Sequence, residues 1–145
     1  MTAHAINTPP SPGMPWPEQG GVYVGTRMKD GAYHHVLIPG GWEHDVQADI
    51  STAASAITAL GEINGFSDWK HGALEDLMLA FVASPGLFRR KGNRSVQLSN
   101  KEVMAGIRGS EVPMVMIFDF ENGAVIAEFY YERHECRPFR YVLAQ

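Results

Sequence analysis

Histidine and cysteine are the residue types in this chain that could carry metal or thiol chemistry. The sequence has six histidines and one cysteine, Cys136. Glu132, His134 and Cys136 alternate along the chain, so an extended backbone would place all three on one face. With His44 or His71 as a further ligand, this trio could bind zinc. Because the chain lacks paired C-x-x-C or H-x-x-x-H spacing, we favour a polar loop with a half-buried thiol and predict no cofactor.

A thiol nucleophile is the second chemical alternative. Cys136 would need His134 as its base, but residues two apart on a strand rarely form the required hydrogen bond. No serine lies in a G-x-S-x-G turn, and neither glycine pair precedes the helix and lysine of a phosphate-binding loop. The sequence therefore predicts a protein that is not an enzyme, with a metal or thiol enzyme as the less favoured alternative.

A basic run provides a candidate charged contact. It surrounds Gly92-Asn93 and comprises Arg89, Arg90, Lys91 and Arg94. Such a run could bind phosphate or an acidic partner surface, although a solvated loop is the commoner explanation. The formal net charge of −4 disfavours a nucleic-acid partner, because proteins that coat a duplex are normally basic.

The composition predicts one globular domain. The chain has 145 residues, of which 45% are hydrophobic and 19% charged. A single cysteine excludes an intramolecular disulfide and fits a reducing compartment. No apolar run approaches the roughly 20 residues that span a bilayer, and no basic segment followed by an apolar one marks a secretory signal. We expect a soluble protein that is cytoplasmic when made and has no membrane partner.

The first twenty residues differ in composition from the rest. They contain five prolines and little apolar content, which is typical of a flexible arm. We therefore expect a Pro-rich arm over residues 1–20 and one domain over residues 21–145. Trp16 is expected to dock on its own domain rather than on a neighbouring subunit. Such an arm also favours attachment to a larger assembly or a homo-oligomer.

Hydrophobic periodicity predicts two helices after a first hairpin. The hairpin has β-rich runs at residues 22–24 and 36–38 on either side of Asp30-Gly31. The first helix covers residues 50–60, with Asp49 or Ser51 as N-cap and Gly61 after its end. The second helix should bury one stripe and end at residues 84–86. The stripe consists of Leu74, Leu77, Met78, Phe81 and Val82.

A second hairpin is predicted over residues 113–132, with its turn at Asn122-Gly123. This turn would pair Phe120 with Val125 and Phe118 with Ala127, and would place the apolar face of the hairpin in the core. Residues 95–98 are expected to form a short strand, residues 101–105 a loop or short helix, and residues 139–143 a final strand. The predicted fold class is α+β, with two helices packed on an antiparallel sheet, a terminal β-hairpin and long loops.

Several stretches together resemble a known family. They are residues 21–26, 30–40, 65–70, 118–123 and 137–142. In this order they are similar to phage-encoded proteins related to the C-terminal domain of the Lcl collagen-like adhesin. The resemblance implies a C-type-lectin-like fold and a phage or prophage origin. The chain departs from the family at residues 70–77, where Pro and Thr are lost, and at residues 97–102, where a Trp is lost. The calcium-binding lectin signatures are also absent, which favours binding without that chemistry.

These observations together predict a non-enzymatic phage or prophage binding module. Residues 41–49 and 87–109 would form a loop face that recognises a protein or glycan partner. Trp42, Arg89 and Asn100 are candidate binding residues there, together with Arg90, Lys91 and Arg94. The alternatives are an intracellular phage protein that inhibits a host or defence protein, and a structural virion subunit. The location would then be cytoplasmic or virion-associated.

Overall fold

The strands of the protein form two five-stranded sheets. The computed structural model describes residues 8–89 and 95–144. The first sheet has the order β1-β2-β3-β10-β5, and the second has the order β4-β9-β6-β7-β8. The first contains β1 (Pro15–Trp16), β2 (Gly21–Lys29), β3 (Ala32–Ile38), β10 (Pro138–Leu143) and β5 (Lys70–His71). The second contains β4 (Val46–Ala48), β9 (His134–Cys136), β6 (Val96–Ala105), β7 (Val112–Asp119) and β8 (Ala124–Phe129).

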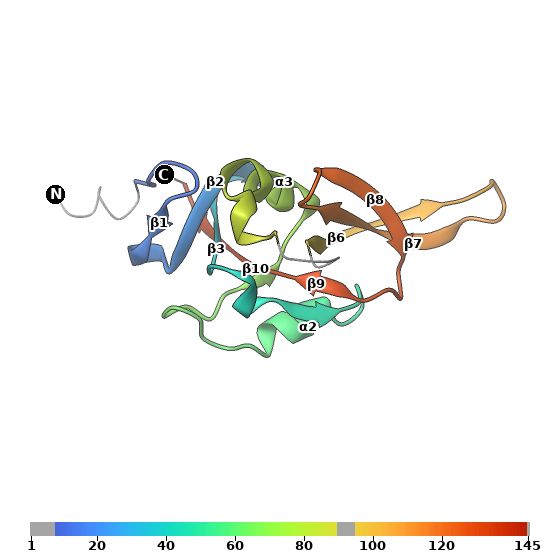
Figure 1. Cartoon of the computed structure of the whole chain (residues 1–145), viewed down its shortest axis with the longest axis horizontal. Coiled ribbons are helices and arrows are strands. Elements are labelled where there is room, and N and C mark those ends of the chain that lie inside the picture. Colours follow the sequence, from blue (N-terminus) through green and yellow to red (C-terminus); the bar gives the residue numbers. More distant parts are fainter. Residues whose placement is uncertain (1–7, 90–94, 145) are drawn as a thin grey trace.

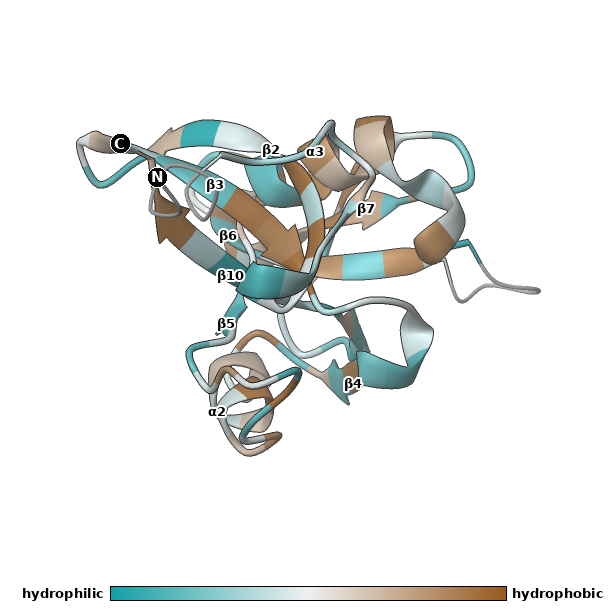
Figure 2. Cartoon of the chain, turned by 90° about the vertical axis from the view of Figure 1, so that its left-hand side faces the viewer, coloured by the Kyte–Doolittle hydropathy of each residue, from teal (hydrophilic) through white to brown (hydrophobic). Residues whose placement is uncertain are grey.

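Among the described strands, all pairs are antiparallel except β6 with β9. Two α-helices, α2 (Ala53–Thr58) and α3 (Leu74–Ala83), lie on opposite sides of the strands (Figures 1 and 2). Short 3-10 helices follow β1, β3 and α3, at η1 (Pro17–Gln19), η2 (Trp42–His44) and η3 (Pro85–Leu87). The predicted α+β class is confirmed, but the strands divide into two sheets where one was expected.

Strand β7 contributes to the two larger hydrophobic clusters of the protein. Phe118 belongs to the cluster that also contains Leu77 and Ala80 of α3. Val115 and Ile117 belong to the cluster that contains Ala53 and Ile57 of α2. Because alternate side chains of a strand point to opposite faces, β7 is buried on both sides.

The proline-rich segment is attached to the domain from Gly13 onward. The Gly13 amide donates to Tyr23 O at 2.7 Å, and β1 pairs with the start of β2. Trp16 is buried against Tyr23 and Leu37, so its predicted docking on its own domain is confirmed. The flexible arm predicted over residues 1–20 is therefore wrong for residues 13–20. Aromatic burial outweighs the proline content there, and residues 1–7 lie outside the described part of the chain.

The first hairpin and the first helix agree with the sequence in type and differ in length. Asp30 and Gly31 both have positive φ, as a two-residue hairpin turn requires, and connect β2 to β3. Helix α2 covers only six of the predicted residues. Asp49 precedes it, and its carboxylate accepts hydrogen bonds from the Thr52 amide and the Ser51 hydroxyl. Gly61 follows with a φ of 71°.

Helix α3 is rotated relative to the stripe that the sequence predicted. Leu77 and Ala80 are buried, whereas Met78 and Val82 are exposed. Asp76 explains the rotation, because its buried carboxylate accepts hydrogen bonds from Arg27, from the Tyr141 hydroxyl and from the Ala73 amide. A buried carboxylate needs such partners, so these contacts turn the Asp76 side of the helix inward.

The terminal hairpin has the predicted faces but a different register. Asp119 pairs with Ala124, and Phe118 pairs with Val125 instead of Ala127. Phe120 leaves the ladder because it is fully buried, with its ring stacked on Phe88 at a centroid distance of 4.0 Å. The connection therefore has four residues, 120–123, and shifts every pair by two positions. On β7, the face that was expected to lie wholly in the core is buried at Phe118 and only half-buried at Met114 and Met116. On β8 it is exposed at Val125 and Phe129.

Strand β6 continues through the segment expected to be a loop or short helix. Residues 102–105 pair with residues 112–115 of β7, beyond a register shift between Leu98 and Glu102. Ser99 is buried at this shift, where its hydroxyl donates to Met116 O at 2.6 Å and accepts from the Lys101 amide. The Asn100 amide donates to Gly72 O in the same place. These hydrogen bonds give partners to the polar groups of the residues at the register shift, so the strand continues beyond it.

Candidate functional site

A two-stranded extension of the second sheet is the most prominent surface feature of the protein. We call residues 102–115 the finger. It consists of the distal half of β6, the start of β7 and the loop that joins them. Figure 1 shows it extending away from the rest of the molecule. Strand β8 begins to pair with β7 only at Met114, so most of the finger lies beyond the third strand.

The finger forms because its sequence combines strand residues with a glycine-containing loop. Val103, Met104, Val112 and Met114 suit an extended backbone. Gly106 and Gly109 adopt φ values of 128° and 87°, which residues other than glycine rarely adopt. The loop is closed by a hydrogen bond of 2.7 Å from the Ser110 amide to Ile107 O. The Glu111 carboxylate accepts from the Gly109 amide at 2.9 Å.

The finger exposes apolar side chains beside polar and charged ones. Ile107 is 81% exposed, Met104 is 65% exposed and Val112 is 41% exposed. The nearby charges of Lys101 and Arg108 are balanced by those of Glu102 and Glu111. Met104 pairs with Pro113 and Val112 with Ala105, so Met104 and Val112 lie on opposite faces of the hairpin, and Ile107 lies in the loop that joins its strands. Single exposed apolar residues are ordinary, but three on one projecting hairpin leave both of its faces partly apolar. Such a surface is suited to burial against a protein partner.

An aromatic cluster lies at the base of the finger. Phe129 pairs with Met114, and its ring is parallel to that of Tyr131 at a centroid distance of 5.5 Å. Tyr130 contacts Tyr131 edge to face, and all three rings are exposed. Tyrosine is enriched at protein interfaces, so the cluster extends the candidate interaction surface from the finger onto β8.

The binding residues predicted from the sequence lie outside the finger. Trp42 is exposed on η2, and Arg89 donates from Nε to Phe120 O at 2.8 Å. Asn100 lies in β6, where its side-chain nitrogen is 3.5 Å from His71 O. A binding role for these three residues stays a prediction. Arg90, Lys91 and Arg94 lie outside the described residues.

The proposed metal trio is not brought together. Cys136 is fully buried in the hydrophobic cluster that contains Ala53 and Ile57 of α2, and its thiol lies 3.7 Å from His134 O. His134 Nε2 is 4.0 Å from Glu128 Oε2, and Glu132 is exposed. Over residues 8–89 and 95–144, no group of three or more His, Cys, Asp or Glu residues could hold a metal ion. The half-buried thiol expected from the sequence is a core side chain because Cys136 points inward from β9.

The electrostatics of Cys136 also oppose nucleophilic chemistry. Burial raises the pKa of its thiol to about 12, and the nearby carboxylate of Asp45 acts in the same direction. A thiol must ionise to act as a nucleophile, so Cys136 remains protonated at neutral pH.

The buried Arg137 has a structural role. Arg137 is the single residue between β9 and β10, where the chain passes from one sheet to the other. Its guanidinium pairs with the buried Asp45 and donates to Gly40 O and Leu87 O. It also lies over the Phe88 ring, 4.1 Å from the centroid. Through these contacts the guanidinium links residues 40–45 with residues 87–88 at the place where the two sheets meet.

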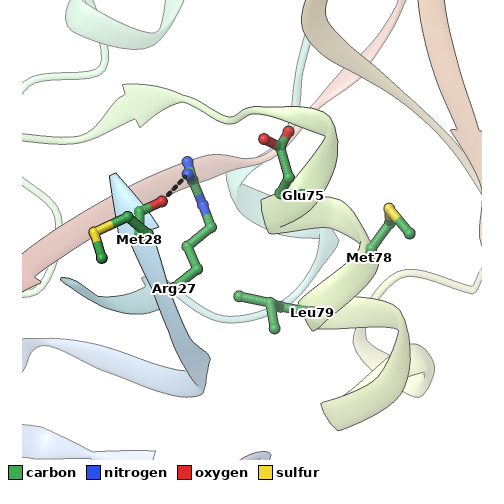
Figure 3. A pocket seen from close by; sticks show the side chains of 5 residues that line it. All are labelled: Arg27, Met28, Glu75, Met78 and Leu79. Carbon is green, nitrogen blue, oxygen red and sulfur yellow. Dashed lines mark hydrogen bonds between the residues drawn. The ribbon is translucent and has the colours of Figure 1, made fainter. Parts of the chain in front are cut away.

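An open pocket of about 260 Å³ lies between β2 and α3 (Figure 3). Met28, Met78 and Leu79 form its apolar walls, and Arg27 and Glu75 supply its charges. Arg27 pairs with Asp76 at 2.5 Å and donates to Met28 O, as the dashed line in Figure 3 shows. The guanidinium is therefore already engaged with the protein, and the pocket offers mainly an apolar recess.

Comparison with known proteins adds no relative. The chain matches no protein-family model, and no curated protein shows significant similarity to it. Of the helices in the described residues, none has the length and apolarity to cross a membrane.

The loop face predicted from the sequence, residues 87–109, includes the first part of the finger, but residues 101–105 were expected to form a loop or short helix there. The residues that sequence reasoning missed are Met104, Ile107 and Val112. The sequence signal for the finger is a glycine-containing segment, Gly106–Gly109, with apolar residues on both sides. This pattern is typical of a β-hairpin with a longer loop. The hairpin pattern was missed because the basic run and the nearby polar residues favoured a loop.

Proposed function

We propose that this chain is a non-enzymatic binding module that contacts a protein partner through the finger. The observation that supports the proposal most is the exposure of Met104, Ile107 and Val112 on a projecting two-stranded hairpin. A hairpin with few contacts to the body is marginally stable in water, so its apolar side chains are more useful in binding than in folding. The charges of the finger nearly cancel once the adjacent Lys101 is included, which favours an apolar contact over electrostatic attraction.

The resemblance to phage-encoded proteins favours a partner from a bacterial host. An intracellular inhibitor would place the finger in a groove of a host or defence protein. A virion subunit would use it to contact another virion protein. A glycan partner is the weaker alternative, because the side chains of Ile107 and Val112, which carry the proposed contact, provide no hydrogen-bonding groups.

Affinity capture from lysate of the encoding cells tests the proposal. The bait proteins are the unaltered chain, a finger variant with Met104→Asp and Ile107→Asp, and a control with Val82→Asp. Val82 is a matched site because it is 84% exposed on α3, away from the finger. We expect one protein to be retained by the unaltered chain and the control and lost with the finger variant.

The captured protein is then purified and its affinity measured against all three chains. Removing a central apolar contact from an interface typically costs about 2 kcal/mol, which is roughly a 30-fold weaker affinity. Equal retention of every captured protein by the finger variant would refute the proposal. Specific binding of the unaltered chain to a glycan array, unchanged in the finger variant, would favour the glycan alternative.

A further inference from the structure

Strand β8 is the last strand of the second sheet among the described residues. Its register with β7 is continuous from Ala124 to Phe129, so no bulge twists the strand away from a neighbour. Edge strands are usually protected by lysine, proline, bulges or short length. The sequence AVIAEF contains no lysine or proline, and its six residues are a typical full strand length. The edge therefore offers backbone amides and carbonyls for pairing with another strand.

The side chains of β8 restrict which strand would fit. Val125 and Phe129 are exposed on the face toward α3, and Ile126 is exposed on the opposite face. A matching strand must be apolar on both faces, whereas an ordinary edge strand carries polar side chains on its solvent face. Apart from Glu128, the strand β8 itself is apolar on both faces, so it comes close to this requirement.

We propose that β8 pairs with β8 of a second copy of this chain, antiparallel about a two-fold axis at Ala127. An isologous contact of this kind needs a self-complementary strand. In this register Val125 lies opposite the partner's Phe129, which is a favourable pair of β-branched and aromatic side chains.

This register keeps the two copies of Glu128 apart. Glu128 is the single charged residue of the strand, and it lies opposite the partner's Ile126. An axis one residue later would place the two copies of Glu128 against each other, which is unfavourable. The dimer would contain one continuous ten-stranded sheet, the sum of two five-stranded halves. Because the paired strands are antiparallel, the two fingers would lie at opposite ends of this sheet.

Sedimentation velocity from low to high micromolar concentration tests the dimer. We expect the chain to pass from 16.0 kDa to twice that mass as the concentration rises. The variant with Val125→Lys and Phe129→Lys places like charges opposite each other and should lose the dimer. The variant with Val125→Lys and Phe129→Glu places opposite charges in both cross-strand pairs and should regain it. Far-UV circular dichroism confirms that each variant is folded.

Val82→Lys and Ile107→Asp serve as controls that should still dimerise, because neither residue lies on the β8 edge. Dimerisation by Ile107→Asp also separates this inference from the binding function of the finger. A monomer at every concentration would overturn the proposal. So would a dimer in the double-lysine variant, or failure of the lysine–glutamate variant to dimerise.

Discussion

Arg137 shows how one residue can hold two sheets together. Its guanidinium has an ion pair, two further carbonyl acceptors and a stacked ring, all with almost no exposure to solvent. Gln97 completes the network, because its carbonyl oxygen accepts from the Arg137 amide and its nitrogen donates to Asp45. Removing one partner of a buried ion pair costs more than the pair itself contributes, because the other charge is left buried.

We therefore predict that Asp45→Ala lowers the free energy of unfolding by about 3–5 kcal/mol. The measurement is urea unfolding followed by tryptophan fluorescence. Glu62→Ala is the control, because Glu62 is exposed, and it should change the free energy by less than about 0.5 kcal/mol. A loss below about 1 kcal/mol in Asp45→Ala would show that the buried charge of Arg137 does not need its carboxylate.

Two histidines give the folded protein a pH dependence. Burial lowers the pKa of both His35 and His71. The unfolded chain therefore binds more protons than the folded protein once the pH falls below about 6.5. We expect the free energy of unfolding to fall as the pH drops from about 6.5 through the folded-state pKa values of the two histidines. Above about pH 6.5, these two histidines should not change the free energy of unfolding.

The variant His71→Gln tests this expectation. Glutamine is neutral and can still donate to Leu98 O, which His71 Nε2 contacts at 2.9 Å. The decrease in unfolding free energy between pH 7 and pH 5 should be smaller in the variant and should not vanish, because His35 remains. An unchanged decrease would contradict a titrating role for His71.

At the scale of elements, the sequence predicted the local turns and periodicities best. Asp30-Gly31 and the ends of α3 follow from local chemistry. The register of the terminal hairpin was missed because it depends on Phe120, which stacks on Phe88 and contacts Phe81 and Phe118. Similarly, the rotation of α3 depends on Asp76, whose partners Arg27 and Tyr141 are far away in the sequence. Local patterns do not contain such distant contacts.

The finger should open more readily than the sheet from which it extends. Beyond Met114 it pairs only two strands, and its residues belong to neither of the larger clusters formed by the described residues. Residues 115–118 of β7, in contrast, lie between these clusters. Hydrogen exchange measured by mass spectrometry should therefore show faster exchange over residues 102–113 than over residues 115–118. Equal protection of both segments would mean that the finger is supported independently of a partner.

At the scale of the whole molecule, the two sheets are expected to unfold together. They share β7 between their clusters, the crossing at Arg137 and the contacts of Asp45 with Gln97. Single domains of this size usually unfold in one transition. Urea midpoints from tryptophan fluorescence and far-UV circular dichroism should coincide, with the measurement made at low micromolar concentration. Separated midpoints would show that one sheet can persist without the other.

The sequence suggested a binding module but placed its contact surface on loops and on a flexible arm. The arm is packed from Gly13 onward, and part of the expected loop face is the paired strand β6. The finger and the β8 edge are two exposed surfaces that the sequence did not predict. They can serve separate purposes, one toward a partner protein and one toward a second copy.

Site-specific photo-crosslinking in living cells tests the role of the finger most directly. A photoreactive phenylalanine analogue is incorporated at position 107 in one chain and at position 82 in another, since both positions are strongly exposed. We predict an adduct of defined mass with another protein at position 107 and none at position 82. The absence of an adduct at position 107, or the same adducts from both positions, would contradict binding through the finger.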